Sequence, residues 1–279
     1  MIVLKRDGRL VLIRQVDHSA LSGEFTRRWG NDRFERPQPL ESVVLASALH
    51  DEGWRGPDEE PLYDPRRKEP LHWRNIEVPE HVVLYSEGIR RVVARDPYAG
   101  LLASMHGAGI YTRRYGTFQV KMTTIRDDVR SVMEAFVAEQ EAAQAALKRA
   151  VWSPAQRRSE FERRLWAQYD VMQIWDRLSL FACLNDLTHP AEDRLGPMPV
   201  TTDGPVVDLL VQTRGGGLIE LDPYPFDVST LDVTVPARVI PDRPYETAED
   251  LRAAMRQASD APIRCRFTPA GGADRRAPA

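Results

Sequence analysis

Residues 40–54, LESVVLASALHDEGW, combine an apolar helix with a His–Asp pair and a glycine that ends it. Apolar residues surround the first two thirds of this segment, which is typical of a helix buried at the centre of a bundle. Neighbouring residues on a helix differ in direction by about 100°, so His50 and Asp51 can converge only where the helix opens before Gly53. The segment therefore predicts a central helix that ends in two metal-ligand side chains. As an alternative, His50 caps the helix terminus and Asp51 faces solvent.

Further residues of the types that bind metal ions occur in other segments with helical apolar patterns. Each of four predicted helices contributes one such residue: His18, His81, His106 and Asp176. Helical bundles build mixed nitrogen and oxygen metal sites in this way, with ligands from several helices. Neutral imidazole and carboxylate groups suit iron, manganese or zinc, and the absence of paired cysteines excludes the usual structural zinc site. We therefore predict a metal centre inside a helical bundle.

Each of these residues also has a purely structural interpretation. His18 could be a histidine of the hydrophobic core, His81 a residue at a helix start, and His106 a packed polar group. Asp176 lies within an apolar run, where an unpaired carboxylate is costly, so it must pair with a cation. Either Arg177 or a metal ion could supply that charge, and we favour the metal ion.

The chain begins with a hairpin pattern and continues with helical patterns. Residues 2–14 alternate in hydrophobicity around the pair Asp7-Gly8, which favours a tight primed turn. Helical patterns then recur up to about residue 187. Residues 52–79 interrupt them and are rich in proline, glycine and charge. We expect this stretch to form a structured loop near the site, and its aromatic residues would suit a lid.

Strand-like segments replace the helical patterns after residue 190. The economical topology pairs the N-terminal hairpin with these strands, so we predict a mostly α fold, in which a helical bundle carries one small antiparallel β-sheet built from both ends of the chain. The expected units are a helical metal-binding domain at residues 15–190, a β-rich subdomain formed by residues 1–14 and 200–268, and a flexible tail at residues 269–279.

The overall composition is that of an ordinary globular protein. With 38 basic and 41 acidic side chains, and no long block of like charge, the chain lacks the electrostatic footprint of a nucleic-acid-binding protein. Its two cysteines do not suffice for a disulfide framework. The sequence shows no signal-peptide layout and no apolar stretch near the ~18 residues that span a membrane. We expect a cytoplasmic protein that binds neither nucleic acid nor membranes, and a homodimer is compatible with the sequence.

The order of the candidate ligands resembles the signature of the HD-domain superfamily of metal-dependent phosphohydrolases and oxygenases. That signature is a His, then a His–Asp pair, then a distant Asp on helices, and binuclear members carry two further histidines before the last Asp. The resemblance implies the following ligands: His18, His50, Asp51, His81, His106 and Asp176. It also implies an HD-like helical fold and two divalent ions, of iron, manganese or zinc, bridged by Asp51.

Several sequence blocks are also similar to the bacterial family called domain of unknown function 3891. These blocks are Gln15–His18, His50–Trp54, Leu101–Gly107, Asp176–Leu180 and Asp222–Phe226. The similarity extends over about residues 1–268. This second resemblance names relatives without naming a reaction, and the HD superfamily contains both hydrolases and oxygenases.

We predict a metal-dependent hydrolase of a small anionic substrate, with a phosphate ester as the first choice. Two divalent ions would lower the pKa of a bridging water and hold the oxygens of a phosphoryl group during displacement. Asp51, His81 and His106 are the ligands that we expect to act in catalysis. A di-iron oxygenase that cleaves a small organic molecule is the second hypothesis, and a metal-binding protein without turnover is the third.

Other side chains are expected to support the metal centre from behind its ligands. A ligating histidine commonly donates its second ring hydrogen to an oxygen acceptor. The candidates for this role are Gln15, Asp17, Glu52 and Trp54. Asp17 has a simpler alternative role, as the N-cap of its helix.

Expected substrate contacts follow His106 within about two helical turns. They are Tyr111, Arg113, Arg114 and Lys121. The planar fork of an arginine matches the geometry of phosphate or carboxylate, which suits a small anionic substrate. The alternative is that these side chains belong to a solvated helix end.

Overall fold

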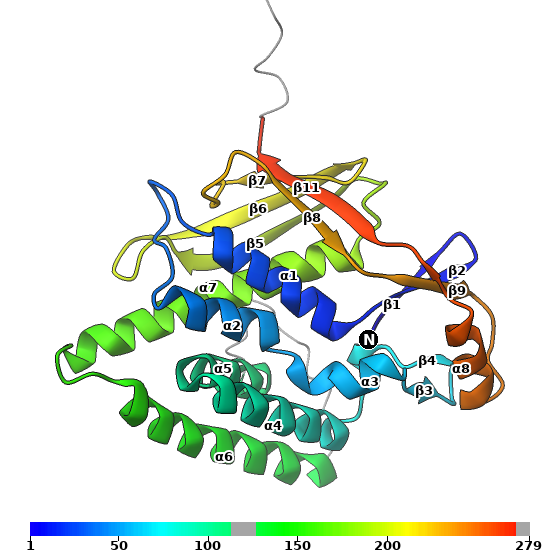
Figure 1. The fold of residues 1–279 in the computed structure, drawn as a ribbon, viewed down its shortest axis with the longest axis horizontal. Coiled ribbons are helices and arrows are strands. Elements are labelled where there is room, and N and C mark those ends of the chain that lie inside the picture. Colours follow the sequence, from blue (N-terminus) through cyan, green and yellow to red (C-terminus); the bar gives the residue numbers. More distant parts are fainter. Residues whose placement is uncertain (113–126, 272–279) are drawn as a thin grey trace, which may run out of the picture.

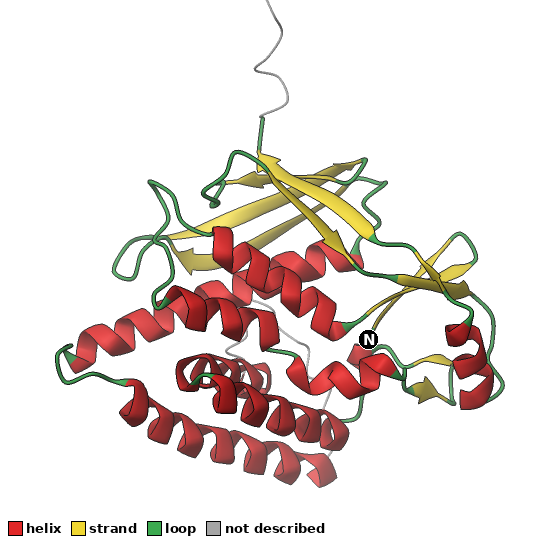
Figure 2. Cartoon of the chain, viewed as in Figure 1, coloured by secondary structure: helices red, strands yellow, loops and turns green. Residues whose placement is uncertain are grey.

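The computed structural model of the protein describes residues 1–112 and 127–271 (Figure 1). A five-stranded β-sheet forms the first layer, helices α1 and α7 lie beneath it, and helices α2, α4, α5 and α6 form the layer beyond them (Figures 1 and 2). A second β-sheet lies at one end of these layers, together with helix α8. No helix among the described residues is long and apolar enough to cross a membrane.

The helices are α1 (Gln15–Arg28), α2 (Leu40–Leu49), α3 (Arg55–Glu59), α4 (Val78–Arg95), α5 (Pro97–Thr112), α6 (Asp127–Val151), α7 (Arg158–Leu184) and α8 (Ala248–Arg256), and the 3-10 helices are η1 (Glu52–Trp54) and η2 (Trp73–Asn75). The strands are β1 (Ile2–Arg6), β2 (Arg9–Ile13), β3 (Tyr63–Asp64), β4 (Glu69–Pro70), β5 (Ala191–Pro199), β6 (Val206–Gly215), β7 (Leu218–Asp222), β8 (Leu231–Val235), β9 (Arg238–Pro241), β10 (Ser259–Asp260) and β11 (Ile263–Pro269).

The predicted fold class, a mostly α, HD-like helical bundle with one small antiparallel β-sheet, is wrong. Helices make up 50% of the structure and strands 23%, so the protein is not all-α. One sheet has four strands in the order β1-β2-β9-β10, and a separate sheet has five strands in the order β5-β6-β7-β11-β8. The larger sheet is mixed, because β11 runs parallel to β7 and antiparallel to β8.

The N-terminal hairpin is confirmed, but most of the C-terminal strands do not pair with it. Asp7 and Gly8 both have positive φ, and β1 and β2 pair from Ile2↔Ile13 to Arg6↔Arg9. Of the later strands, β9 pairs with β2 and β10 with β9. The other five strands form their own sheet, whose register depends on contacts between residues far apart in the sequence.

The five-stranded sheet covers α1 and α7 with one apolar face. Leu209, Val211 and Phe267 are buried on this face within the main hydrophobic core. The opposite face carries cross-strand ion pairs such as Arg266 Nε to Asp232 Oδ1 at 2.6 Å. This alternation of apolar and charged residues is typical of a sheet with one buried and one solvated face.

Residues 52–79 form short elements, of which η1 packs against α4 and the segment of β3 and β4 lies beside the N-terminal hairpin and α8. Strands β3 and β4 pair with each other, and the hydroxyl of Tyr63 donates to the backbone oxygen of Tyr245 at 2.6 Å. The backbone N–H of Trp73 donates to the carbonyl of Met1 at 2.9 Å. The stretch is therefore a structured loop, as predicted, and it is anchored at the N-terminal hairpin.

Helix α4 approaches η1 so closely that two glycines are required. A Cβ atom at Gly53 would lie 1.9 Å from the carbonyl oxygen of Leu84, and one at Gly88 would lie 2.5 Å from the backbone nitrogen of Gly53. Both obstacles are backbone atoms, which cannot rotate away. This contact fixes the backbone two residues after Asp51 against α4.

We expect Gly53→Ala to destabilise the protein by about 1–3 kcal/mol, because the added methyl group overpacks a rigid backbone contact. Gly56→Ala is the matched control, since nothing lies within 4 Å of a Cβ at Gly56. That change should be neutral or stabilise α3 by up to about 1 kcal/mol. Urea unfolding of both variants measures the difference, and equal free energies of unfolding would contradict the packing described above.

Candidate metal centre

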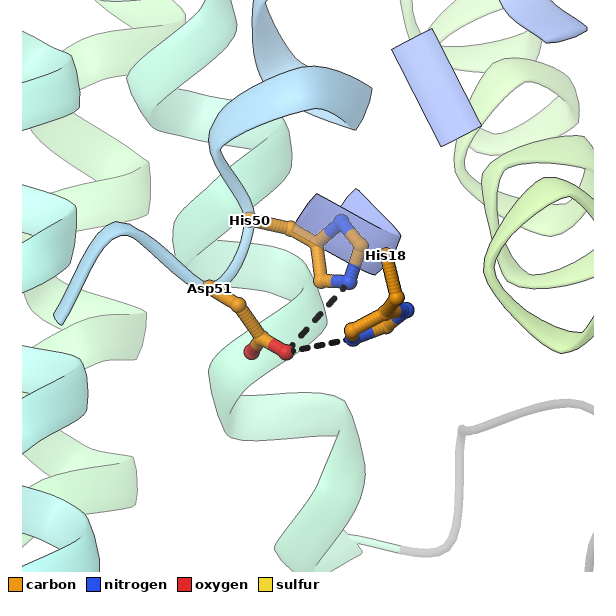
Figure 3. A group of neighbouring side chains, drawn as sticks. All are labelled: His18, His50 and Asp51. Carbon is orange, nitrogen blue, oxygen red and sulfur yellow. Dashed lines mark hydrogen bonds and ion pairs between the residues drawn. The ribbon is translucent and has the colours of Figure 1, made fainter. Parts of the chain in front are cut away.

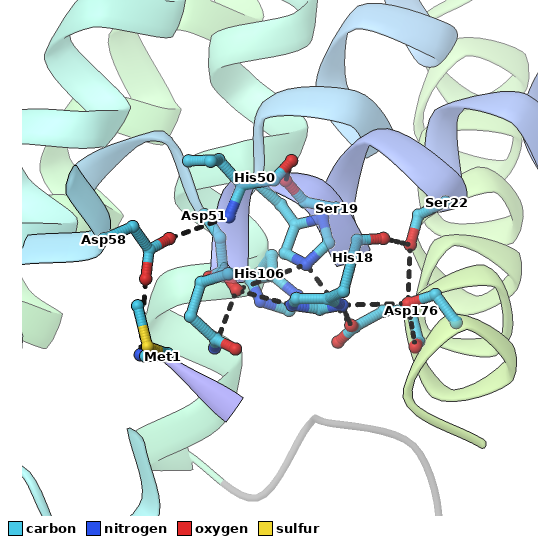
Figure 4. A network of polar contacts seen from close by, with 12 residues as sticks. Met1, His18, Ser19, Ser22, His50, Asp51, Asp58, His106 and Asp176 are labelled. Atoms are coloured by element: carbon cyan, nitrogen blue, oxygen red, sulfur yellow. Dashed lines mark hydrogen bonds and ion pairs between the residues drawn. The ribbon is translucent and has the colours of Figure 1, made fainter. Parts of the chain in front are cut away.

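Five of the six sequence-predicted ligands meet in the interior between α1, α2, α5 and α7 (Figure 4). Each of these side chains belongs to a residue that is at most 3% exposed. His50 is the C-cap of α2 and Asp51 the N-cap of η1, so the predicted opening of the helix before Gly53 is present. The five residues are His18, His50, Asp51, His106 and Asp176.

The ligand atoms of these residues form two groups that share His50. One group is His18, His50 and Asp51, drawn in Figure 3, and the other is His50, His106 and Asp176. Within each group the nitrogen and oxygen atoms lie within 4.8 Å of one another. His50 Nε2 is 3.3 Å from Asp176 Oδ1 and 3.8 Å from Asp51 Oδ2, so it lies between the two carboxylates.

The ring of His50 has a tautomer that its surroundings fix. Its Nδ1 lies 2.8 Å from the backbone carbonyl oxygen of Ser47. Because a carbonyl oxygen only accepts hydrogen bonds, Nδ1 must carry a hydrogen, and Nε2 of the neutral ring is a lone pair. Nε2 has no hydrogen-bond partner among the described residues. Between two carboxylates, this nitrogen would either carry a proton or coordinate a cation.

The ring of His106 is held in the same sense. The side-chain amide of Gln173 donates through Nε2 to the carbonyl of Tyr169 at 3.1 Å, which leaves its Oε1 as the atom 3.2 Å from His106 Nδ1. Oε1 can only accept, so the hydrogen of the neutral ring lies on Nδ1. The nitrogen with a lone pair is again Nε2.

The ring of His18 is oriented in the same way, by a hydrogen bond to Ser179. The hydroxyl of Ser179 donates to the carbonyl of Asp176 at 2.7 Å, and its oxygen therefore accepts from His18 Nδ1 at 2.9 Å. His18 Nε2 then faces Asp51 Oδ2 at 2.8 Å. Histidines that bind metal ions typically donate the second ring N–H to an oxygen in this way, and three buried imidazoles here do so.

The carboxylates of the cluster are held in their ionised form. Burial would raise the pKa of Asp176, but His50, His18 and His106 together outweigh it and lower that pKa to about 2. Burial would also raise the pKa of Asp51, but His50 and His18 hold it well below its usual range. Burial lowers the pKa of His50, yet Asp176 and Asp51 outweigh it and raise that pKa to about 9.

His50 alone cannot neutralise two buried carboxylates. His106 supplies no second charge, because burial and the neighbouring His50 lower its pKa to about 4. Uncompensated charge in a protein interior is costly. A divalent cation coordinated by imidazole nitrogens and carboxylate oxygens would balance the charge, and these ligand types fit zinc, manganese or iron.

His81, the sixth predicted ligand, lies next to the cluster but is not among the groups whose ligand atoms converge in the described structure. Its Nδ1 is 2.5 Å from the hydroxyl of Tyr111, and its ring contacts Tyr85 at a centroid distance of 4.6 Å. Burial lowers the pKa of His81 to about 4, so the ring is neutral. Tyr111, predicted as a substrate contact, is buried against His81.

Of the four residues expected to support the ligands, two contact candidate ligands in the described structure and two pair with arginines instead. Gln15 contacts the cluster, because its Nε2 donates to Asp51 Oδ2 at 3.2 Å. Trp54 packs on His81 with ring centroids 6.0 Å apart.

Asp17 and Glu52 do not contact the ligands. The carboxylate of Asp17 pairs with Arg14 at 2.7 and 2.8 Å, and that of Glu52 pairs with Arg55 at 2.9 and 2.7 Å. Each acid is three residues from its arginine, and this local pairing turns it away from the metal centre. The other predicted substrate contacts lie outside the described residues, namely Arg113, Arg114 and Lys121.

Sequence reasoning missed three residues that orient the ligands. Tyr85 donates to Asp51 Oδ1 at 2.6 Å, and Gln173 and Ser179 hold His106 and His18. A signal was present on α7, because Gln173 and Ser179 lie three residues before and after Asp176 and so share its face. Tyr85 similarly lies one turn after His81 on α4.

The family model described as "Protein of unknown function (DUF3891)" matches residues 1–242 of the chain. No curated protein and no solved structure matches the chain. The matched range runs from β1 to the end of β9 and contains every residue of the buried cluster.

We expect divalent zinc or manganese at about 100 times its Kd to stabilise the protein by about 2.7 kcal/mol, and His50→Ala to lose most of this gain. His50 belongs to both ligand groups, so its removal disrupts both. Thermal unfolding with and without metal measures the effect. His189→Ala is the control, because the His189 side chain is 76% exposed. Equal metal-induced shifts in His50→Ala and wild type would refute the assignment.

Proposed function

The chain belongs to the DUF3891 family of proteins of unknown function, and from its buried His–Asp cluster we propose that it is a metal-dependent hydrolase of a small phosphate ester. The observation that carries this proposal is the common orientation of three imidazoles. Each holds a hydrogen on Nδ1 against an oxygen acceptor, and the Nε2 atoms of His18 and His50 face the ionised carboxylates of Asp51 and Asp176.

The order of the ligands along the chain supports the same reaction class. A His, a His–Asp pair and a distant Asp are the signature of the HD-domain superfamily, and His18, His50-Asp51 and Asp176 repeat it. The resemblance concerns the site, because the two β-sheets depart from the expected bundle. We choose hydrolysis first because this set of imidazoles and carboxylates can bind zinc, manganese or iron, and hydrolysis, unlike oxygenation, requires no redox-active ion.

The side chains of the centre have distinct tasks in this proposal. His18, His50, Asp51 and Asp176 would hold one ion, and His81 and His106, together with Asp51, would hold a second. The hydroxyl of Tyr85 fixes the carboxylate of Asp51 at 2.6 Å. Such fixed ligands cost little reorganisation during the reaction.

The bound ions would lower the pKa of a coordinated water and withdraw charge from the phosphoryl oxygens. In the reaction the water oxygen forms a bond to phosphorus while the phosphorus–oxygen bond to the alcohol breaks. The two hydrogens of the water end on the phosphate and the alcohol. The buried position of His18, His50, Asp51, His106 and Asp176, each at most 3% exposed, would limit the access of bulk water to the reacting groups.

Protein purified without added metal should contain bound zinc, manganese or iron, and should release phosphate from small aryl phosphates. We expect Asp176→Asn to lower kcat/KM by about 100-fold or more, because the ion loses a charged ligand. His189→Ala should retain full activity.

Other outcomes would replace the proposal. Iron with oxygen consumption and no phosphate release would favour the oxygenase hypothesis. Bound metal without turnover of any phosphate ester in a broad panel would favour a metal-binding protein.

The number of bound ions can be tested at His81. Two ions per chain are expected in wild type and one in His81→Ala, because only the second site depends on this ring. Elemental analysis after dialysis gives both values. Val83→Ala is the control on the same helix, since Val83 is 64% exposed. One ion per chain in both wild type and His81→Ala would contradict a binuclear centre.

A further inference from the structure

Gln15 has a buried side-chain oxygen for which the described part of the chain provides no donor. Gln15 is the first residue of α1 and is only 3% exposed. Its Nε2 donates to Asp51 Oδ2 at 3.2 Å, and a carboxylate oxygen can only accept, so the orientation of the amide is fixed. Oε1 therefore points away from Asp51, and it has no hydrogen-bond partner among the described residues.

Two other buried glutamines, Gln168 and Gln173, use both ends of the amide. Gln168 accepts from the hydroxyl of Tyr98 at 2.6 Å and donates to the carbonyl of Gln38 at 2.5 Å. Gln173 likewise faces His106 with its oxygen and donates with its nitrogen. Buried acceptors are almost always satisfied in folded proteins. We therefore expect Gln15 Oε1 to accept a hydrogen bond from a group other than the described residues.

The position of this acceptor limits what the donor can be. The same amide group that carries Oε1 donates through its nitrogen to the carboxylate of Asp51. That carboxylate also contacts His18 and Tyr85. A role limited to holding Asp51 requires only the nitrogen of the amide. The oxygen does not contribute to that role. It belongs to the same amide group as the nitrogen that contacts Asp51, so it lies close to the cluster.

We infer that Gln15 is a positioning residue for the attacking water, with its amide spanning from Asp51 to that water. The water donates one hydrogen to Oε1, and this contact orients its oxygen relative to the centre. The inference rests on the proposed hydrolase function. It assigns to Gln15 an effect on turnover that is separate from its contact to the ligand.

Two substitutions separate the two ends of the amide. Gln15→Met keeps the length of the side chain and removes both the donor and the acceptor, whereas Gln15→Glu loses the donor to Asp51 and keeps an acceptor oxygen. Gln168→Met is the matched control, because it removes a buried glutamine whose two bonds lie away from the cluster. Circular dichroism and manganese binding verify that each variant is folded and loaded.

We expect Gln15→Met to lower kcat by about tenfold or more, with KM within about threefold of wild type, because a misplaced nucleophile affects the chemical step. Gln15→Glu should recover most of kcat, and Gln168→Met should leave it unchanged. An equal loss in Gln15→Glu and Gln15→Met would assign the effect to the Asp51 contact and overturn the inference. Wild-type activity in Gln15→Met would also overturn it.

A crystal structure of the manganese-loaded wild type provides a readout that needs no turnover. A water oxygen should lie within about 3.2 Å of Gln15 Oε1. Absence of that water in a loaded site would overturn the inference even if the protein proves to be a hydrolase. Its presence in a protein without phosphatase activity would support the Gln15 contact and reject the proposed reaction instead.

Discussion

The structure depends on two buried carboxylates, Asp51 and Asp176, which both face His50 Nε2 where four helices converge. Both carboxylates remain ionised, and each is at most 3% exposed. Charge in such an environment must be balanced nearby. The histidines around the two acids are oriented to meet this requirement. The Nδ1 atoms of His18 and His50 bond to oxygens of Ser179 and Ser47, and their Nε2 atoms face the acids.

The architecture brings the required elements together and holds them rigidly. Helix α1 crosses α2 so closely that a Cβ at Gly23 would lie 2.6 Å from the Cβ of Ala48, which sets His18 against the end of α2. The five-stranded sheet covers α1 and α7 from the other side (Figure 1). Helix α5 is buried along most of its length, and His106 projects from it into the core. Ligands on packed helices are positioned more precisely than ligands on loops.

The sequence was sufficient to find the candidate ligands but not the fold. His and Asp residues within apolar helical patterns must be buried, and burial of these groups implies a shared partner, so local pattern predicted the convergence of His18, His50, Asp51, His106 and Asp176. Sheet order follows from pairing between distant segments, and nothing local indicates that β11 lies parallel to β7. The carboxylates of Asp17 and Glu52 pair with arginines three residues away, a competition that the apolar helical pattern does not indicate. Tyr85 was missed because its partner, Asp51, is 34 residues away.

The DUF3891 family supplies relatives but no reaction, so the account depends on whether a metal ion occupies the cluster. X-ray absorption at the edge of the bound metal, in protein loaded with one equivalent of zinc or manganese, measures this most directly. We predict a shell of only nitrogen and oxygen atoms at about 2.0–2.2 Å, with the outer-shell scattering of two or more imidazole rings. A shell of water oxygens without imidazole scattering, or one that contains sulfur, would contradict the account.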